Sequence, residues 1–266
     1  ERADEEEDIF VTNEEAMLLK DKSAMLIVVD VNVPAMTECP ELLKSISTIV
    51  VLDHHRQSNE TIKNAVVSYV EPYASSTCEM VAEILQYIVD KPKLKNIEAD
   101  AMYSGILVDT DNFVIKAGVR TFEAAAYLRR AGADVTRVRK MFREDMEHCR
   151  IRTAIINKAE IYMDEFAIST FDGENVSGAT VVGAKAANAL LNIQGIRGSF
   201  VLTALQDCIY VSARSIDELN VQVIMEKFGG GGHLTMAAAQ LKDVSLSDAA
   251  EMLKHTLRKM HEDGDI

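Results

Sequence analysis

Two short apolar runs, each followed by an acidic residue, stand out in the first half of the chain. The run 25–29 precedes Asp30, and the run 49–52 precedes Asp53-His54-His55. A run of Ile, Val and Leu bounded by polar residues predicts a buried strand. We therefore expect two strands here, with residues 39–47 forming the crossover between them. The carboxyl ends of parallel strands lie along one edge of a sheet, so polar residues that follow them can converge.

Helical spacing of apolar residues follows these runs. It predicts helices from about residue 75, over 97–108 and over 121–131, and a Ser or Thr can cap the first of them. Asp109 comes directly after the second predicted helix. From 135 to 161 the chain has a helical period and contains neither Pro nor Gly, which predicts one connecting helix.

The pattern changes after residue 161. It predicts strands over 166–171, 199–205 and 208–212, with a tight turn at Gln206-Asp207, and helices over 183–191, 219–228 and 245–261. Strands that alternate with helices, with few hairpin signals, indicate layered α/β structure with a parallel sheet. We predict an α/β protein with a domain boundary near residue 150.

Composition narrows the class of protein. The 266 residues are 48% hydrophobic and carry a net charge of −14, which supports a packed core but disfavours a surface built for long nucleic acid. Four cysteines without a CxxC pair indicate reduced thiols of a cytoplasmic protein. We see no signal peptide and no apolar run long enough to span a membrane.

Asp30, His54 and Asp109 each lie at or just past the end of an apolar run, so we expect them to meet at one edge of the sheet. Carboxylate and imidazole ligands suit a hard or borderline divalent ion such as Mn²⁺. Two such ions can activate water and stabilise an in-line phosphoryl displacement. The alternative is a set of helix caps and solvated loop residues, with the histidines on the surface.

The second half contains four consecutive glycines and a histidine at 229–233. One glycine would serve as a helix C-cap, whereas four indicate backbone that approaches a ligand closely and offers amide groups to phosphate. A flexible surface turn is the alternative. Arg214 ends a predicted strand and could pair with phosphate.

These motifs occur in the order found in the DHH phosphoesterases that have a DHH-associated second domain: Asp30, Asp53-His54-His55, Asp109, Arg214 and 229–233. The chain most resembles the cyclic-di-AMP phosphodiesterases of the GdpP type. Residues 220–239 are similar to the phosphate- and base-binding segment of that subfamily. The resemblance starts at about residue 10 and implies a DHH domain at 1–134, a linker helix at 135–160 and a DHH-associated nucleotide-binding domain at 161–266.

The resemblance also implies roles for individual residues. Asp30 would bridge two Mn²⁺ ions, and His54 and Asp109 would ligate one of them. Asp53 would orient a histidine, and His55 would contact the scissile phosphate or steady a bridging hydroxide. Attack by that hydroxide would open cyclic di-AMP to linear 5′-pApA. The residues expected to hold the far phosphate and nucleotide are Arg214, Gly230, Gly231, Gly232 and His233.

The sequence departs from the family in two places. The family's first motif, a His and two Asp in an HxxxDxD pattern, is missing, and residues 1–22 contain no histidine. Because those groups would bind both metals, we expect this chain by itself to bind metal weakly and to show little activity. Met236 stands where we expect a smaller or polar residue. The resemblance further implies a homodimer and a cytoplasmic domain of a membrane-anchored parent protein.

Two other functions fit these residues. A nanoRNase or pAp phosphatase of the same superfamily shares the motif order, and a nucleotide-sensing module with a catalytically incomplete first domain would explain the missing motif. The net charge disfavours a RecJ-like exonuclease, and the glycine run disfavours an inorganic pyrophosphatase. We expect the ligand to be a cyclic dinucleotide or a short adenine nucleotide.

Overall fold

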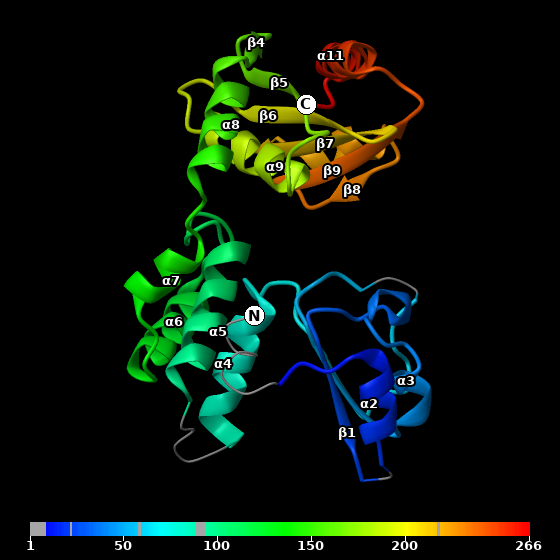
Figure 1. Cartoon of the computed structure of the whole chain (residues 1–266), viewed down its shortest axis with the longest axis vertical. Coiled ribbons are helices and arrows are strands. Elements are labelled where there is room, and N and C mark those ends of the chain that lie inside the picture. The colour runs from blue at the N-terminus through cyan, green and yellow to red at the C-terminus, as the bar shows by residue number, and fades with distance from the viewer. Residues whose placement is uncertain (1–8, 22, 58–59, 89–93, 217–218) are drawn as a thin grey trace. The chain divides into compact units, whose positions relative to one another are not determined.

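The computed structural model describes residues 9–266 except 22, 58–59, 89–93 and 217–218. The chain divides into two compact units, Glu1–Arg143 and Glu144–Ile266, shown in Figure 1. Each unit has a sheet and hydrophobic clusters of its own. Among the described helices, none is both long and apolar enough to cross a membrane.

The first unit contains a parallel sheet of three strands in the order β1-β2-β3. The two predicted strands are confirmed as β1 (Met25–Val29) and β2 (Thr48–Asp53). The crossover between them carries the short helices η1 (Pro34–Met36) and α3 (Leu42–Ser45). We did not predict β3 (Val67–Val70), whose four residues are too few to set up a period.

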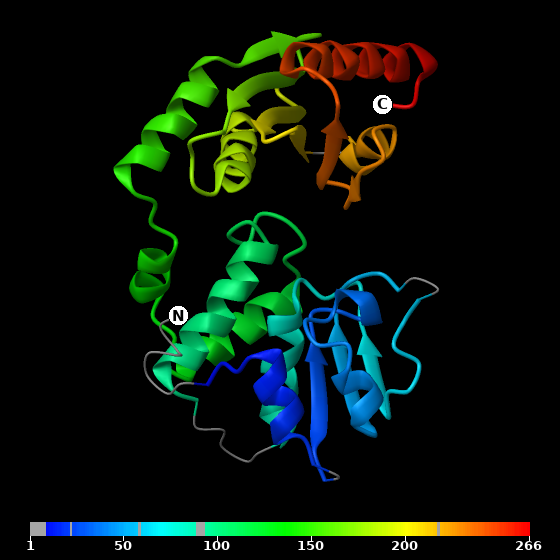
Figure 2. The same ribbon diagram turned by 45° about the vertical axis from the view of Figure 1, so that its right-hand side comes forward.

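Helices make up the rest of the first unit. They are α2 (Asn13–Leu19), α4 (Thr77–Ile88), α5 (Asn96–Asp109), α6 (Val119–Arg130) and α7 (Val135–Met141). The three predicted helices after residue 75 are confirmed as α4, α5 and α6, which pack on one another around Ile106 and Leu128. Figure 2 shows this helical group beside the sheet. The packing matters because α4 brings Thr77 to Asp30, which follows β1, and α5 brings Asp109 to His54, which follows β2.

The predicted single helix over 135–161 is wrong. The chain forms α7 and then α8 (Met146–Asn157), with a break between them. The break has a local cause: the side chain of Asp145 accepts the backbone N–H of His148 at 2.8 Å, which starts a new helix. Apolar periodicity alone does not reveal that an aspartate in the middle of such a run will act as a cap.

The second unit contains a mixed sheet of six strands in the order β4-β5-β6-β7-β9-β8. Strands β5 and β6 are parallel and every other pair is antiparallel. The predicted strands are confirmed as β5 (Phe166–Asp172), β6 (Gly198–Leu205) and β7 (Cys208–Ser215). Strands β4 (Glu160–Tyr162), β8 (Gly231–Gly232) and β9 (Met236–Lys242) were not predicted.

Helices cover both faces of this second sheet. One cluster joins α8 and α9 (Ala179–Leu190) to Val201 of β6. The other joins α10 (Val221–Glu226) and α11 (Leu246–Asp263) to Phe200 and Leu202. Adjacent residues of β6 point to opposite faces, so this strand lies in the middle of the core. The fold is therefore α/β with a parallel sheet and a second sheet, as predicted.

Candidate active site

Asp30 lies immediately after β1, at the carboxyl end of the parallel sheet. Its backbone is left-handed, with φ of 65°, and its N–H donates to the carbonyl oxygen of Leu52 at 2.9 Å. The hydroxyl of Thr77, at the start of α4, donates to Asp30 Oδ1 at 2.8 Å. Because strand and helix both hold it, the carboxylate has a defined position although its side chain is 58% exposed.

His54 follows β2 and lies between two carboxylates. Its Nε2 atom is 3.5 Å from Asp30 Oδ1 and 3.8 Å from Asp109 Oδ2, and its side chain is only 6% exposed. The structure thus brings these three residues together. The prediction that all three lie at the sheet edge needs one correction: Asp109 is the last residue of helix α5, and helix packing delivers it to the strand ends.

A hydrogen-bonded group of Asn32, Asp53 and His55 lies behind this cluster. The fully buried Asp53 carboxylate accepts from Asn32 Nδ2 at 2.5 Å. It also accepts from the His55 backbone N–H at 3.1 Å, and it lies 2.7 Å from His55 Nδ1. Asn32 Nδ2 reaches the His55 carbonyl oxygen as well, at 3.4 Å. Bonding at Nδ1 fixes the ring orientation of His55.

The acids of the cluster perturb their surroundings. Burial raises the pKa of Asp109, the nearby His54 lowers it, and the charge of Asp30 raises it further. Burial, and then the charges of Asp109 and Asp30, raise the pKa of Cys78 to about 11. Burial also lowers the pKa of Lys116. Carboxylates held close together in a partly buried place favour a bound cation.

The donor set fits a divalent ion. One ligand atom each from Asp30, His54 and His55 lies within 4.8 Å of the others. First-row divalent ions bind nitrogen and oxygen at about 2.0–2.2 Å, so two ligands of one ion lie roughly 3–4 Å apart. The distances from His54 to Asp30 and Asp109, 3.5 and 3.8 Å, fall in that range. Asp30, His54 and His55 can therefore hold a metal with little rearrangement, and Asp109 lies beside this group through its approach to His54.

In the second unit, Arg214 lies on β7 opposite Met236 of β9. Its Nε atom donates to Asn188 Oδ1 of α9 at 2.7 Å, and another guanidinium nitrogen donates to the carbonyl oxygen of Ala213 at 2.8 Å. These bonds hold the guanidinium group against helix α9 and strand β7. A cation held in this way is suited to binding a phosphate.

Most of the glycine run has a structural cause. Gly229 has φ of 71°, and the Gly230 N–H donates to the carbonyl oxygen of Met225 at 2.9 Å, which is the glycine-terminated end of a helix. A Cβ atom on Gly230 or Gly232 would overlap the backbone of β9. At Gly231 a Cβ would meet nothing within 4 Å. Close approach to β9 therefore explains Gly230 and Gly232, and Gly231 is left open to a ligand.

Sequence reasoning missed two residues that support the cluster. Asn32 carried no local signal in the sequence, and the structure places its Nδ2 atom 2.5 Å from Asp53 Oδ2. A Ser or Thr near residue 75 was expected only as a helix cap, but the hydroxyl of Thr77 bonds Asp30. Both depend on contacts between segments distant in sequence, which local patterns do not reveal.

Comparison with known proteins gives consistent matches along the chain. Residues 4–106 match the N-terminal domain of the DHH family, and residues 166–262 match the DHHA1 domain. The chain is 45% identical over 92% of its length to the cyclic-di-AMP phosphodiesterase PdeA of Listeria monocytogenes. It is 41% identical over 96% of its length to the cyclic-di-AMP phosphodiesterase GdpP of Bacillus subtilis.

The chain spans 37% and 39% of the length of those two relatives. Among solved structures, an exopolyphosphatase-related protein from Bacteroides fragilis superposes with a TM-score of 0.78 at 18% identity. That match covers 93% of this chain and 74% of the other. At this identity the likeness establishes a shared fold.

Proposed function

The chain carries a DHH family N-terminal domain followed by a DHHA1 domain, and on that premise we propose that it is a metal-dependent phosphodiesterase that hydrolyses cyclic di-AMP to 5′-pApA. The main support is the 41–45% identity to two curated cyclic-di-AMP phosphodiesterases over more than nine-tenths of the chain. The grouping of Asp30, His54 and Asp109 in the first unit supplies matching chemistry.

In this proposal Asp30, His54 and Asp109 would hold the metal, which we take to be a pair of Mn²⁺ ions. A divalent metal there supplies an activated water and neutralises charge on the phosphate. Asp53 holds Nδ1 of His55, so His55 acts through Nε2 on the scissile phosphate. Asn32 and Thr77 act as positioning residues, because they touch Asp53 and Asp30.

The second unit binds the part of the substrate that does not react. We assign the far phosphate to Arg214 and to the segment containing Gly230, Gly231, Gly232 and His233. We propose 1–134 as the catalytic domain, 135–160 as the linker and 161–266 as the nucleotide-binding domain. A homodimer and a membrane-anchored parent protein belong to the same proposal, which light scattering and fractionation of the native protein would test.

The decisive experiment compares hydrolysis of cyclic di-AMP, pApA and pAp with Mn²⁺ present and after chelation. In a form extended upstream by a segment that contains a His and two Asp, we expect conversion of cyclic di-AMP to pApA that requires the metal and is lost in His54→Ala and Asp109→Ala. The exposed Asp207→Asn variant is the matched control. A clear preference for pAp would favour a pAp phosphatase, and full activity after chelation would contradict the metal assignment.

A Mn²⁺ titration followed by calorimetry adds a readout that does not depend on turnover. We expect weak binding to residues 1–266 that His54→Ala weakens further. We also expect a stronger signal and full activity in a form extended upstream by a segment that contains a His and two Asp. Two tightly held ions in residues 1–266 alone would show that the first motif is not needed.

A further inference from the structure

Glu79, in the first turn of α4, is a buried acidic residue to which no role has yet been given. Its side chain is only 2% exposed, and a glutamate is seldom buried to this extent unless it is paired. Its Oε2 atom accepts hydrogen bonds from the Ser75 hydroxyl at 2.5 Å and from the Ser75 backbone N–H at 3.3 Å. Its other oxygen, Oε1, lies 3.9 Å from Nε of Arg120. Hydrogen bonds on one side and a cation on the other therefore offset the cost of burying this carboxylate.

The hydrogen bonds of Glu79 close a turn immediately before α4. Ser75 and Ser76 are both buried, and the Ser76 hydroxyl oxygen accepts the backbone N–H of Glu79 at 3.0 Å. In a capping box, a glutamate at this position returns to the N–H of the residue that caps the helix. Here it reaches one residue further back, to Ser75. Residues 75 and 76 are thus both bonded to Glu79, which restricts the chain at Thr77 between them.

Thr77 connects this turn to the proposed metal site. Its hydroxyl donates to Asp30 Oδ1 at 2.8 Å, and the same oxygen lies 3.5 Å from His54 Nε2. The carboxylate of Asp30 is mostly exposed, so a hydrogen bond is needed to hold it in one orientation. The Thr77 hydroxyl therefore keeps Oδ1 beside His54.

Arg120 joins α4 to two other elements. It lies in the first turn of α6, against which α4 packs (Figure 1). It donates to the Glu83 carboxylate from Nε at 2.8 Å and from Nη2 at 2.7 Å, and to the Tyr69 hydroxyl of β3 at 3.3 Å. A cation is unfavourable near a helix N-terminus, and the acidic partners on α4 compensate for that. Arg120 thereby fixes the start of α4 relative to α6 and β3.

We propose that Glu79 is a positioning residue for the metal site: by holding the turn before α4, it places the Thr77 hydroxyl that orients Asp30. The role of Asp30 as a metal ligand rests on the proposed function. Residues that support metal ligands typically change metal affinity about 10–100-fold when they are removed. Glu83 supplies a matched control, because it pairs with the same arginine one turn further along α4, away from Ser75.

Mn²⁺ binding to the whole chain, measured by calorimetry without substrate, tests the proposal. We expect Thr77→Val and Glu79→Ala each to weaken Mn²⁺ binding about tenfold. Thr77→Ser keeps the hydroxyl and Glu79→Gln keeps a side-chain oxygen for Ser75, so both should bind nearly as the wild type does. Glu83→Ala should also bind Mn²⁺ normally, although it removes the closer of the two acidic partners of Arg120.

A double variant distinguishes positioning from a general loss of structure. If Glu79 acts through Thr77, Glu79→Ala combined with Thr77→Val will weaken Mn²⁺ binding no more than Thr77→Val alone, because residues in one hydrogen-bonded network are not additive. Independent losses would multiply to about a hundredfold. Such multiplication, or equal Mn²⁺ affinities in Glu79→Ala and Glu83→Ala, would overturn the proposal.

Hydrogen exchange followed by mass spectrometry gives a readout that needs no metal. The peptide over residues 74–80 should exchange faster in Glu79→Ala, because the Ser75 N–H loses its acceptor, and should be unchanged in Glu83→Ala. Equal exchange in these two variants would show that Glu79 does not hold the turn. If circular dichroism shows Glu79→Ala to be unfolded, Ser75→Ala removes the other partner of the same bond. We then expect weaker Mn²⁺ binding in Ser75→Ala, and unchanged affinity would overturn the proposal.

Hydrolysis of cyclic di-AMP, followed in parallel, separates the positioning role from the proposed function. A chain that binds Mn²⁺ with the expected dependence on Glu79 but never hydrolyses cyclic di-AMP would support the positioning role and contradict the reaction. Hydrolysis of cyclic di-AMP with normal Mn²⁺ affinity in Glu79→Ala would support the reaction and contradict the positioning role. Absence of Mn²⁺ binding by the wild type would contradict both.

Discussion

Removing the side chain of Asp53 is expected to destabilise the first unit and to leave His55 without support. The carboxylate is fully buried. It lies 2.5 Å from Asn32 Nδ2, 3.1 Å from the His55 backbone nitrogen and 2.7 Å from His55 Nδ1. In Asp53→Ala these three donors lose their shared acceptor, and the alanine leaves a void beside them.

The size of the effect follows from two opposing contributions. A hydrogen bond to a charged group contributes about 1.5–3 kcal/mol, so three contribute roughly 4.5–9 kcal/mol. Burying a carboxylate costs several kcal/mol, and the substitution relieves that cost. We therefore expect Asp53→Ala to lower the free energy of unfolding by roughly 2–4 kcal/mol.

Asp53→Asn removes the charge of the side chain and keeps its shape, so it tests the two contributions separately. Its amide oxygen can still accept from His55, while its new NH₂ group faces the amide of Asn32. Asn32 Oδ1 is buried and has no hydrogen-bond partner among the described residues, so a rotation of the Asn32 amide lets it accept. We expect a stability change below about 1.5 kcal/mol. Hydrolysis should fall about a hundredfold or more, because His55 loses its anionic partner.

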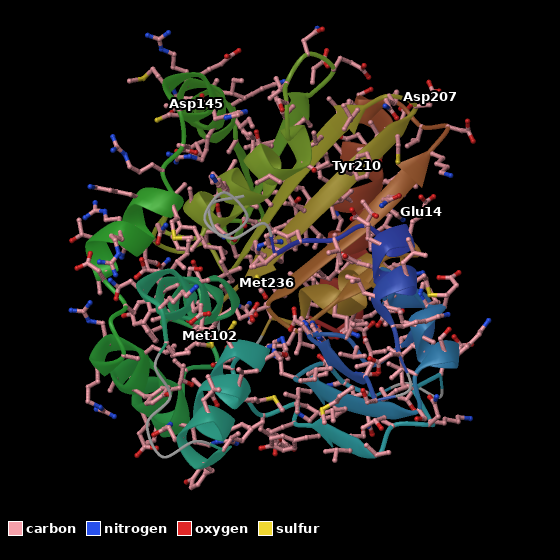
Figure 3. The ribbon with its side chains drawn as sticks, turned by 60° about the horizontal axis from the view of Figure 1, so that its bottom comes forward. Glu14, Met102, Asp145, Asp207, Tyr210 and Met236 are labelled. Atoms are coloured by element: carbon pink, nitrogen blue, oxygen red, sulfur yellow. The ribbon has the colours of Figure 1, made fainter. Side chains whose placement is uncertain are left out.

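Urea unfolding followed by circular dichroism measures stability, and turnover is measured in a form of the protein that hydrolyses cyclic di-AMP. Asp207→Asn makes the same chemical change in the exposed turn between β6 and β7 (Figure 3) and serves as the control. If Asp53→Asn were as destabilising as Asp53→Ala, the hydrogen-bond reasoning would be refuted. A loss below about 1 kcal/mol in Asp53→Ala would refute it too.

Three further predictions concern other parts of the chain. Arg137→Ala leaves the fully buried Asp100 without the cation 2.6 Å away, and should lower the midpoint of urea unfolding more than Arg130→Ala does; equal midpoints for the two variants would contradict this. Because the pKa of Cys78 is raised to about 11, its thiolate fraction is small at pH 8. Alkylation of Cys78, followed by peptide mass spectrometry, should be slow there and should accelerate about tenfold per pH unit until about pH 11; a rate independent of pH would refute the assigned cause. Gly230→Ala forces a Cβ against β9 and should lower the free energy of unfolding by about 1–3 kcal/mol, whereas Gly231→Ala meets open space and should unfold like the wild type; equal melting curves for both variants would contradict the packing argument.

The local pattern of apolar and polar residues was sufficient to predict those helices and strands whose pattern lies within one continuous segment. The apolar runs before Asp30 and Asp53, and the helical periods of α4 to α6, are set by the residues themselves. The same holds for the order of the motifs, because the order of residues along the chain does not depend on how the chain folds. These features predicted two parallel strands, the α/β class and the residues that could bind a metal.

Contacts between distant segments decided the rest. Asp109 reaches His54 because α5 packs against α4 and α6, and Asn32 matters because it touches Asp53, 21 residues away. Gly230 and Gly232 are required because strand β9 packs closely against them. The alanine-rich sequence of β9 did not predict a strand. Side chains acquire such roles from the free energy of packing and hydrogen bonding across the fold. That free energy is a property of pairs of segments brought together, so no single stretch of sequence contains it.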